Sequence, residues 1–180
     1  MSKAYDKVEC DFLLHLMGKM GFHRRWIRPI LECISSITYS VLVNGEPNGN
    51  IIPTKGIRQG DPLLPYHFLL CSEGLIGLIK KVVSKNKIRG FSFCKNGPKI
   101  SQLFFANDSL LFCRAQLGDI NCIKNILEVY ERASRQQINK DKTTLFFSRF
   151  VSPATKETIK VLLGVPEKKN MKGILVCQWW

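Results

Sequence analysis

The chain has 180 residues, of which 45% are hydrophobic and 23% charged, and its 27 Lys and Arg against 14 Asp and Glu give a formal net charge of +13. This composition excludes an intrinsically disordered chain, and no stretch approaches the roughly 20 consecutive apolar residues of a membrane-spanning helix. The surplus of positive charge predicts a polyanionic partner, with nucleic acid as the first candidate and an anionic membrane as the second.

The first part of the chain is predicted to be helical. Apolar residues at three- and four-residue spacing predict an amphipathic helix over 7–20, and Gly21 stands where a helix-ending glycine is expected. A second helix is predicted over 23–35. Within it, Pro29 predicts a kink or a late start, because proline lacks the backbone N–H that a helix interior requires.

The hydrophobic period then changes to that of a β-hairpin. Residues 37–43 are rich in β-branched and aromatic side chains, Asn44-Gly45 is a strong two-residue turn signal, and 49–53 can supply the second strand. Glycine, proline and polar residues predict a loop over 56–62, and a long apolar helix is predicted to follow over about 65–83.

A second hairpin is predicted around Asn107 and Asp108. Apolar runs at 103–106 and 110–112 bracket these two residues, which places both of them in a tight turn. The remaining predicted elements are helices over 119–135 and 154–163 and a strand over 143–148. Together the elements predict an α+β domain with a largely antiparallel sheet, and the sequence contains no internal repeat.

The cysteines and the first residues predict an intracellular location. The seven cysteines are scattered and form no C-x-x-C pair, which favours buried free thiols in a reducing compartment over disulfides or a zinc site. The segment Met1–Lys7 is polar and is not followed by the apolar stretch of a secretory signal. We therefore expect the protein in the cytoplasm or the nucleus. The sequence makes no prediction of the oligomeric state.

Basic residues gather in two clusters, one around Trp26 and one in a stretch, 74–107, that contains no acidic residue. The candidate nucleic-acid-binding residues are Arg24, Arg25 and Arg28 in the first cluster and Lys80, Lys81, Lys85 and Lys87 in the second. The alternative is a solvated basic surface that keeps the chain soluble. Two clusters combined with a charge of +13 favour nucleic-acid contact.

The hairpin that carries Asp108 is a candidate metal site. A carboxylate at a tight turn between two buried strands has a fixed position, and Mg²⁺ prefers oxygen ligands in fixed octahedral geometry. A pair of such ions supports phosphoryl or nucleotidyl transfer. The alternative for an Asn-Asp pair between two strands is a simple turn.

Four short motifs occur in order along the chain: SKAYDKV at 2–8, RQGDPL at 58–63, FANDS at 105–109 and INKDK at 138–142. In this order and at these separations they resemble the reverse transcriptase domain of LINE-type (non-LTR) retrotransposons. The resemblance extends from residue 1 to about residue 148. The four motifs correspond to motifs A to D of that family's catalytic palm.

The resemblance implies a partial right-hand polymerase palm, an antiparallel sheet backed by helices, without fingers and thumb. It implies RNA-templated DNA synthesis with two Mg²⁺ ions, with an RNA template and a DNA primer as partners and no membrane. On this basis residues 1–148 are expected to form the partial palm domain. Residues 149–166 would be a helical extension and 167–180 a disordered tail.

The family's residue roles carry over to matching positions. Asp108 corresponds to the second acidic residue of the third motif, a metal ligand, and Lys142 to the lysine that assists the leaving pyrophosphate. The implied nucleotide-binding positions are Tyr5, Arg58, Gln59 and Gly60. Two of these residues have local alternatives: Tyr5 as a core aromatic residue and Lys142 as a solvated charge at a strand edge.

The chain departs from the family pattern at its metal ligands. The first Asp of motif A would stand directly before Met1, and Asn107 occupies the position of the first Asp in the third motif. A neutral amide is a poor bridge between two divalent cations. Only Asp108 remains of three expected carboxylates, so we do not expect this copy to hold Mg²⁺ as the family does. In addition, Arg135 stands where the family commonly has glycine.

The sequence therefore predicts a reverse transcriptase domain of retroelement origin that is catalytically inactive. An alternative from a different functional class is a non-catalytic protein that binds nucleic acid through its basic residues. A third is a pseudogene product without function, which would lack a cooperative fold because its sheet edge and apolar faces stay uncovered.

Overall fold

A computed structural model of the chain describes residues 10–36, 38–52, 64–92, 94–105, 108–167 and 175–178. The chain divides into two compact units, residues 1–71 and 72–180, with the boundary inside one long helix. Buried apolar side chains form a core within each unit. No helix of the described segments is long and apolar enough to cross a membrane.

The described residues form a mixed α+β fold, which confirms the predicted class. The helices are α1 (Cys10–Lys19), α2 (Arg24–Ser35), α3 (Leu64–Ser84), α4 (Leu117–Ser134) and α5 (Pro153–Leu163). The strands are β1 (Tyr39–Val43), β2 (Glu46–Ile51), β3 (Gln102–Phe105), β4 (Asp108–Leu111), β5 (Thr144–Leu145) and β6 (Leu175–Gln178). Each helix lies at a position that the sequence predicts, whereas the loop predicted over 56–62 lies outside the described residues.

In the first unit, α1 and α2 pack through their apolar faces. The buried cluster consists of Leu13, Met17, Ile34 and Cys71, with Phe12, Ile27, Ile30 and Leu70 packed against it. Pro29 lies inside α2, and the helix extends for six residues beyond it to Ser35. The start of α2 is capped by His23, whose ring Nδ1 accepts a hydrogen bond of 3.2 Å from the backbone N–H of Arg25.

The hairpin β1–β2 of the first unit has the turn that its sequence predicts. Asn44 and Gly45 both have positive φ, 53° and 87°, as a tight two-residue hairpin turn requires. The strands pair antiparallel from Val43 and Glu46 outward, with an irregularity between Tyr39 and Val41. Every side chain of β2 is exposed. Within this unit the hairpin is therefore stabilised mainly by its turn and by backbone hydrogen bonds, and less by the burial of side chains.

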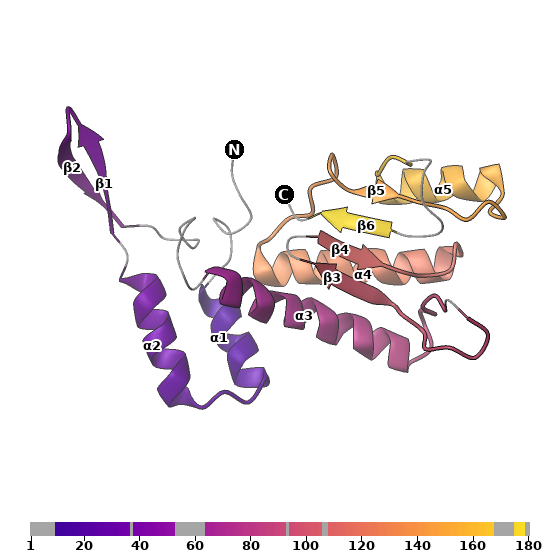
Figure 1. The fold of residues 1–180 in the computed structure, drawn as a ribbon, viewed down its shortest axis with the longest axis horizontal. Coiled ribbons are helices and arrows are strands. Elements are labelled where there is room, and N and C mark those ends of the chain that lie inside the picture. Colours follow the sequence, from indigo (N-terminus) through magenta and orange to yellow (C-terminus); the bar gives the residue numbers. More distant parts are fainter. Residues whose placement is uncertain are drawn as a thin grey trace. The chain divides into compact units, whose positions relative to one another are not determined.

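In the second unit, four antiparallel strands lie side by side in the order β3-β4-β6-β5 (Figure 1). Strand β5 has two residues, Thr144 and Leu145, and is therefore shorter than the strand predicted over 143–148. Strand β6 falls within 167–180, where the sequence predicts disorder; its four residues pair with β4, and Leu175 and Val176 also pair with β5. The structure thus differs from the prediction at these four residues.

The core of the second unit is organised by α4. Its buried apolar side chains recur at three- and four-residue spacing and are Ile120, Ile123, Ile126, Leu127 and Tyr130. Other buried side chains are Leu111 and Leu145 of the sheet, Phe112 directly after β4, and Ile159 of α5. Burying a large apolar side chain contributes about 1.5–3 kcal/mol, so this amphipathic face makes a large contribution to the unit's stability.

Helix α4 ends in an unusual way, with Arg135 in the left-handed conformation at φ 60° and ψ 4°. The turn is fixed by its neighbours: the Tyr130 hydroxyl donates to Gln136 Oε1 at 2.7 Å, and the Gln136 backbone N–H donates to Ser134 Oγ at 3.2 Å. Both Gln136 and Ser134 are buried. The left-handed conformation favours glycine, because any other residue pays for the close approach of its Cβ to the backbone.

We expect the change Arg135→Gly to stabilise the chain by about 1 kcal/mol relative to Arg135→Ala. Both variants remove the same side chain, but only alanine keeps the Cβ that the left-handed conformation penalises. Urea denaturation followed by circular dichroism measures the difference. Equal stability of the glycine and alanine variants would show that the backbone at this position is not constrained.

The described cysteines are free thiols, as the sequence predicts, but they are not uniformly buried. Burial raises the pKa of the Cys71 thiol to about 12. The pKa of Cys113 is likewise raised to about 12 by burial, with a further contribution from the Asp119 carboxylate that Arg114 opposes. Cys33 and Cys94 are exposed, so the prediction of buried thiols is wrong for these two.

Candidate functional site

The structure describes only part of the site that the motifs predict. Asp108 and Lys142 belong to the described residues, although for Asp108 only the backbone is described. The predicted site residues that lie outside the described segments are Tyr5, Arg58, Gln59, Gly60 and Asn107. Their predicted roles therefore stay predictions.

Asp108 is the first residue of β4 and not part of the hairpin turn. It pairs with Phe105 of β3 on one side and with Gln178 of β6 on the other. Because Phe105 and Asp108 are register partners, Asp108 belongs to a strand, whereas the sequence predicts it in the turn. The backbone of Asp108 is thus held between two neighbouring strands, which gives this acidic residue a fixed place at the end of the sheet.

Lys142 is exposed and follows a turn that Asn139 organises. The Asn139 side-chain oxygen accepts hydrogen bonds from the backbone N–H groups of Asp141 and Lys142, at 3.1 and 3.2 Å. Thr143 is buried, and its hydroxyl donates to the Asn139 carbonyl at 2.8 Å. The motif therefore forms a tight polar turn in which Lys142 is exposed to solvent, and the buried Thr143 separates it from β5.

The metal ions that the motifs imply require a cluster of acidic ligands. Within the residues that the structure describes, no group of three or more His, Cys, Asp or Glu side chains could hold a metal ion. Asn107, at one ligand position of the motif, offers one neutral oxygen where a carboxylate offers two charged ones. Asn107 and the side chain of Asp108 lie outside what the structure describes, so the ligand set of the implied site stays a prediction.

The first basic cluster lies on the exposed surface of α2. Arg24, Arg25 and Arg28 are all exposed. Arg28 forms an ion pair of 2.9 Å with Glu32 one turn later, but the two side chains are 84% and 65% exposed, so solvent weakens this pair. The guanidinium of Arg25 lies 5.7 Å from the centre of the Trp26 ring.

The second basic cluster begins at the end of α3 and continues into the segment behind it. The four predicted contacts, Lys80, Lys81, Lys85 and Lys87, are all exposed. Their shared property is a solvated run of positive charge in the second unit. Such a run fits a contact with phosphate groups, which needs charge but little shape.

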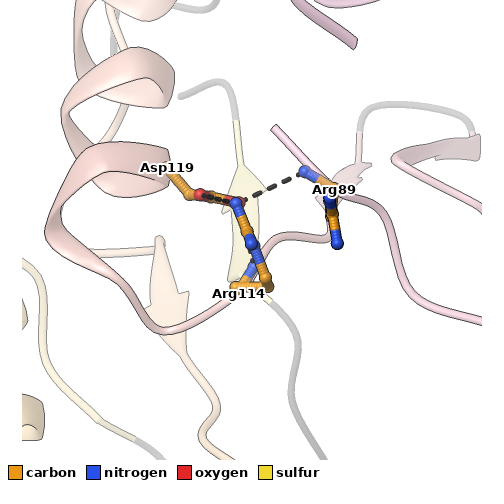
Figure 2. Close-up of polar contacts among 3 residues, drawn as sticks. All are labelled: Arg89, Arg114 and Asp119. Atoms are coloured by element: carbon orange, nitrogen blue, oxygen red, sulfur yellow. Dashed lines mark hydrogen bonds and ion pairs between the residues drawn. The ribbon is translucent and has the colours of Figure 1, made fainter. Parts of the chain in front are cut away.

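A buried carboxylate that the sequence analysis did not single out connects three segments of the second unit. Asp119, in the first turn of α4, is 2% exposed. Its oxygens accept hydrogen bonds from the Arg114 guanidinium at 2.8 and 3.2 Å and from the backbone N–H of Arg89 at 3.2 Å (Figure 2). The Arg114 backbone N–H donates as well, at 3.4 Å.

This network raises the pKa of the Arg114 guanidinium above its usual value, chiefly through its side-chain hydrogen bond to Asp119. It links the segment after α3, the exit of β4 and the start of α4, and a carboxylate in the first helical turn also complements the helix dipole. The sequence could have marked Asp119 as a helix-start residue, because acidic residues are enriched in the first helical turn. It could not have identified Arg89 and Arg114 as the hydrogen-bond donors to Asp119.

We expect Asp119→Asn to destabilise the chain by about 2–3 kcal/mol, because the variant leaves a partly buried guanidinium and a backbone N–H without a charged acceptor. Asp141→Asn is the matched control, since this exposed acid lies in a surface turn and its loss should cost less than about 0.5 kcal/mol. Denaturant unfolding of both variants measures the effect. Equal stabilities would contradict the structural role of Asp119.

Comparison with known proteins places this geometry in a family. The chain matches the family described as Reverse transcriptase (RNA-dependent DNA polymerase) over residues 1–167. The match covers most of the sequence and includes all four motifs. The chain therefore belongs to the reverse transcriptase family, as the motifs predict.

Individual relatives point to one branch of that family. The chain is 23% identical over 142 residues to an uncharacterised 149 kDa protein of transposon TX1 from Xenopus laevis, covering 79% of this chain and 10% of the relative. It is 25% identical over 150 residues to a Pol polyprotein of the type-1 retrotransposable element R2 from Popillia japonica, covering 83% and 24%. Both relatives are proteins of non-LTR retrotransposons.

A third relative is an uncharacterised mitochondrial protein of Arabidopsis thaliana, 43% identical over 68 residues, which are 38% of this chain and 56% of that protein. The chain thus spans 56%, 10% and 24% of the lengths of the three relatives. These comparisons confirm a reverse transcriptase domain of non-LTR retrotransposon origin.

Proposed function

We propose that this chain is a reverse transcriptase palm domain that no longer catalyses DNA synthesis but still binds nucleic acid. The observation that carries the first half is Asn107 at a metal-ligand position of the third motif. The observation that carries the second half is the net charge of +13, with two exposed basic clusters. The family gives the class of ligand, because its members act on an RNA template and a DNA primer.

The described fold supports a partial palm. The antiparallel strands β3 and β4 form a hairpin with Asp108 at the start of β4, and helices of the same unit contribute to its core. On this proposal residues 1–148 form the palm, and α5 belongs to an extension over 149–166.

The loss of catalysis follows from charge. Two Mg²⁺ ions bring four positive charges to one place, and nucleotidyl transfer depends on carboxylates that hold the ions against the phosphate oxygens. Asp108 supplies one negative charge, whereas Asn107 supplies none. The site therefore lacks the charge needed to bring two ions together, although Lys142 still stands on the surface to meet a phosphate.

We expect the chain to add no nucleotide above background to a DNA primer on an RNA template, with either Mg²⁺ or Mn²⁺ as the ion. Asn107→Asp tests the charge argument directly, because it returns a carboxylate to the ligand position of the third motif. The matched control, Asn107→Asp/Asp108→Asn, removes the neighbouring carboxylate and should stay inactive.

Primer extension by the unmodified chain would contradict the loss of catalysis. Extension by Asn107→Asp alone would show that Asn107 is the single defect. An active reverse transcriptase added to the same template and primer, with and without the chain, confirms that the substrate is competent.

Binding is expected to weaken steeply with salt, because each phosphate that is neutralised releases counterions. Arg24→Gln/Arg25→Gln/Arg28→Gln and Lys80→Gln/Lys81→Gln/Lys85→Gln each remove three charges. Each triple variant should lower the slope of log K against log salt by about 2 on a single-stranded oligonucleotide if all three side chains contact phosphates. Fluorescence anisotropy at several salt concentrations measures these slopes. Binding that does not depend on salt would contradict an electrostatic contact.

A further inference from the structure

The first unit contains an open groove between α1 and α2, with a volume of about 1070 Å³. Its size is comparable to the upper end of the roughly 300–1,000 Å³ that ligand pockets occupy. We propose that this groove binds a single strand of nucleic acid, with its phosphates on the basic rim and one base stacked on Phe22. This inference rests on the proposed nucleic-acid binding and specifies which form of nucleic acid is bound, and where.

The charge of the groove fits a polyanion. Four of its lining residues are cations, Lys19 from α1 and Arg24, Arg25 and Arg28 from α2, and none of the described residues that line it is acidic. Arg28 is held by Glu32, which does not line the groove, through a solvent-exposed pair that a phosphate can replace. Arginine also suits phosphate because its planar guanidinium can donate two parallel hydrogen bonds.

Phe22 gives the groove an aromatic surface. It follows α1 in the connection to α2, is 40% exposed and lines the groove. Its backbone N–H donates to the Met17 carbonyl at 3.0 Å, and the positive φ of Gly21, 86°, lets the chain turn sharply before it. The backbone that carries the ring is therefore fixed, which lowers the entropy cost of stacking a base on it.

The combination of ring and cations favours a single strand over other anions. In a duplex the base faces are covered by their neighbours, whereas an unpaired base can stack on an aromatic side chain while arginines hold the backbone. An acidic peptide would use the cations, but its Asp and Glu side chains offer no flat apolar group to stack on Phe22. Ile27 and Leu31 also line the groove. Their apolar side chains can pack against a base, whereas contact with a carboxylate would cost desolvation energy.

The test compares Phe22→Leu, which keeps apolar bulk but loses the ring, with Phe22→Tyr, which keeps the ring. The matched control is Phe150→Leu, since Phe150 is 82% exposed beside Arg149 in the other unit. Anisotropy measures binding of the full chain to an oligothymidylate of about 12 nucleotides and to a duplex of the same length. We expect Phe22→Leu to weaken single-strand binding by about 10-fold and to leave duplex binding unchanged, with the other two variants close to wild type.

Single-strand binding by Phe22→Leu equal to that of the wild type would overturn the groove assignment and leave the proposed function standing. An equal loss on single strand and duplex, or displacement of the oligothymidylate by polyglutamate at matched charge, would overturn it as well. No binding of either nucleic acid by the wild type would overturn both proposals. Photo-crosslinking of the wild type to a bromouridine-substituted strand needs no variant to fold: crosslinks at Phe22 support the groove, and crosslinks only outside 14–31 contradict it.

Discussion

The second unit depends on one buried charge, the carboxylate of Asp119. It is 2% exposed, and removing a carboxylate from water is costly unless charged donors replace the solvent. Arg114 provides such a donor, and the backbone N–H of Arg89 adds another hydrogen bond. Because these partners come from different segments, the same interaction holds together the segment after α3, the segment after β4 and the first turn of α4. The Asp108 strand is thereby held at both of its ends, by the sheet and by this network.

The local patterns of the sequence predict much of the fold. The three- and four-residue period locates α4, and the Asn44-Gly45 pair identifies the first hairpin, because both signals act over a few residues. Strand β6 could not be found in this way, since its four residues gain their structure from pairing with β4 and β5, which lie far away in the sequence. The partners of Asp119 share this property, because an acidic residue at a helix start looks the same whether it is solvated or buried.

For the candidate site, the sequence predicts the motif residues but not how the basic residues are grouped in space. The motif residues themselves are visible in the sequence, and the register of Asp108 with Phe105 corrected only its place in the hairpin. What the sequence could not supply is the grouping of the basic residues. Arg24, Arg25 and Arg28 form a cluster in the sequence, but only the packing of α1 on α2 adds Lys19 and Phe22 to the same groove. One basic cluster thus lines a groove, whereas the other, at Lys80–Lys87, is a solvated run of charge. A groove can recognise the shape of a ligand, and a solvated run responds mainly to its charge.

On the proposed function, the basic residues attract a template and a primer, while Asn107 stands where a carboxylate would help to hold the metal ions against them. Binding and catalysis are therefore expected to be separated in this protein, because phosphate contact requires cations alone and nucleotidyl transfer requires ordered acidic ligands as well.

The most direct test of this separation is a single-turnover experiment with the template–primer saturated by excess protein, in which anisotropy reports binding and incorporation of one labelled nucleotide is followed in the same sample. We expect a fully bound template–primer and no incorporated nucleotide over hours with Mg²⁺. Incorporation approaching one nucleotide per primer would contradict it.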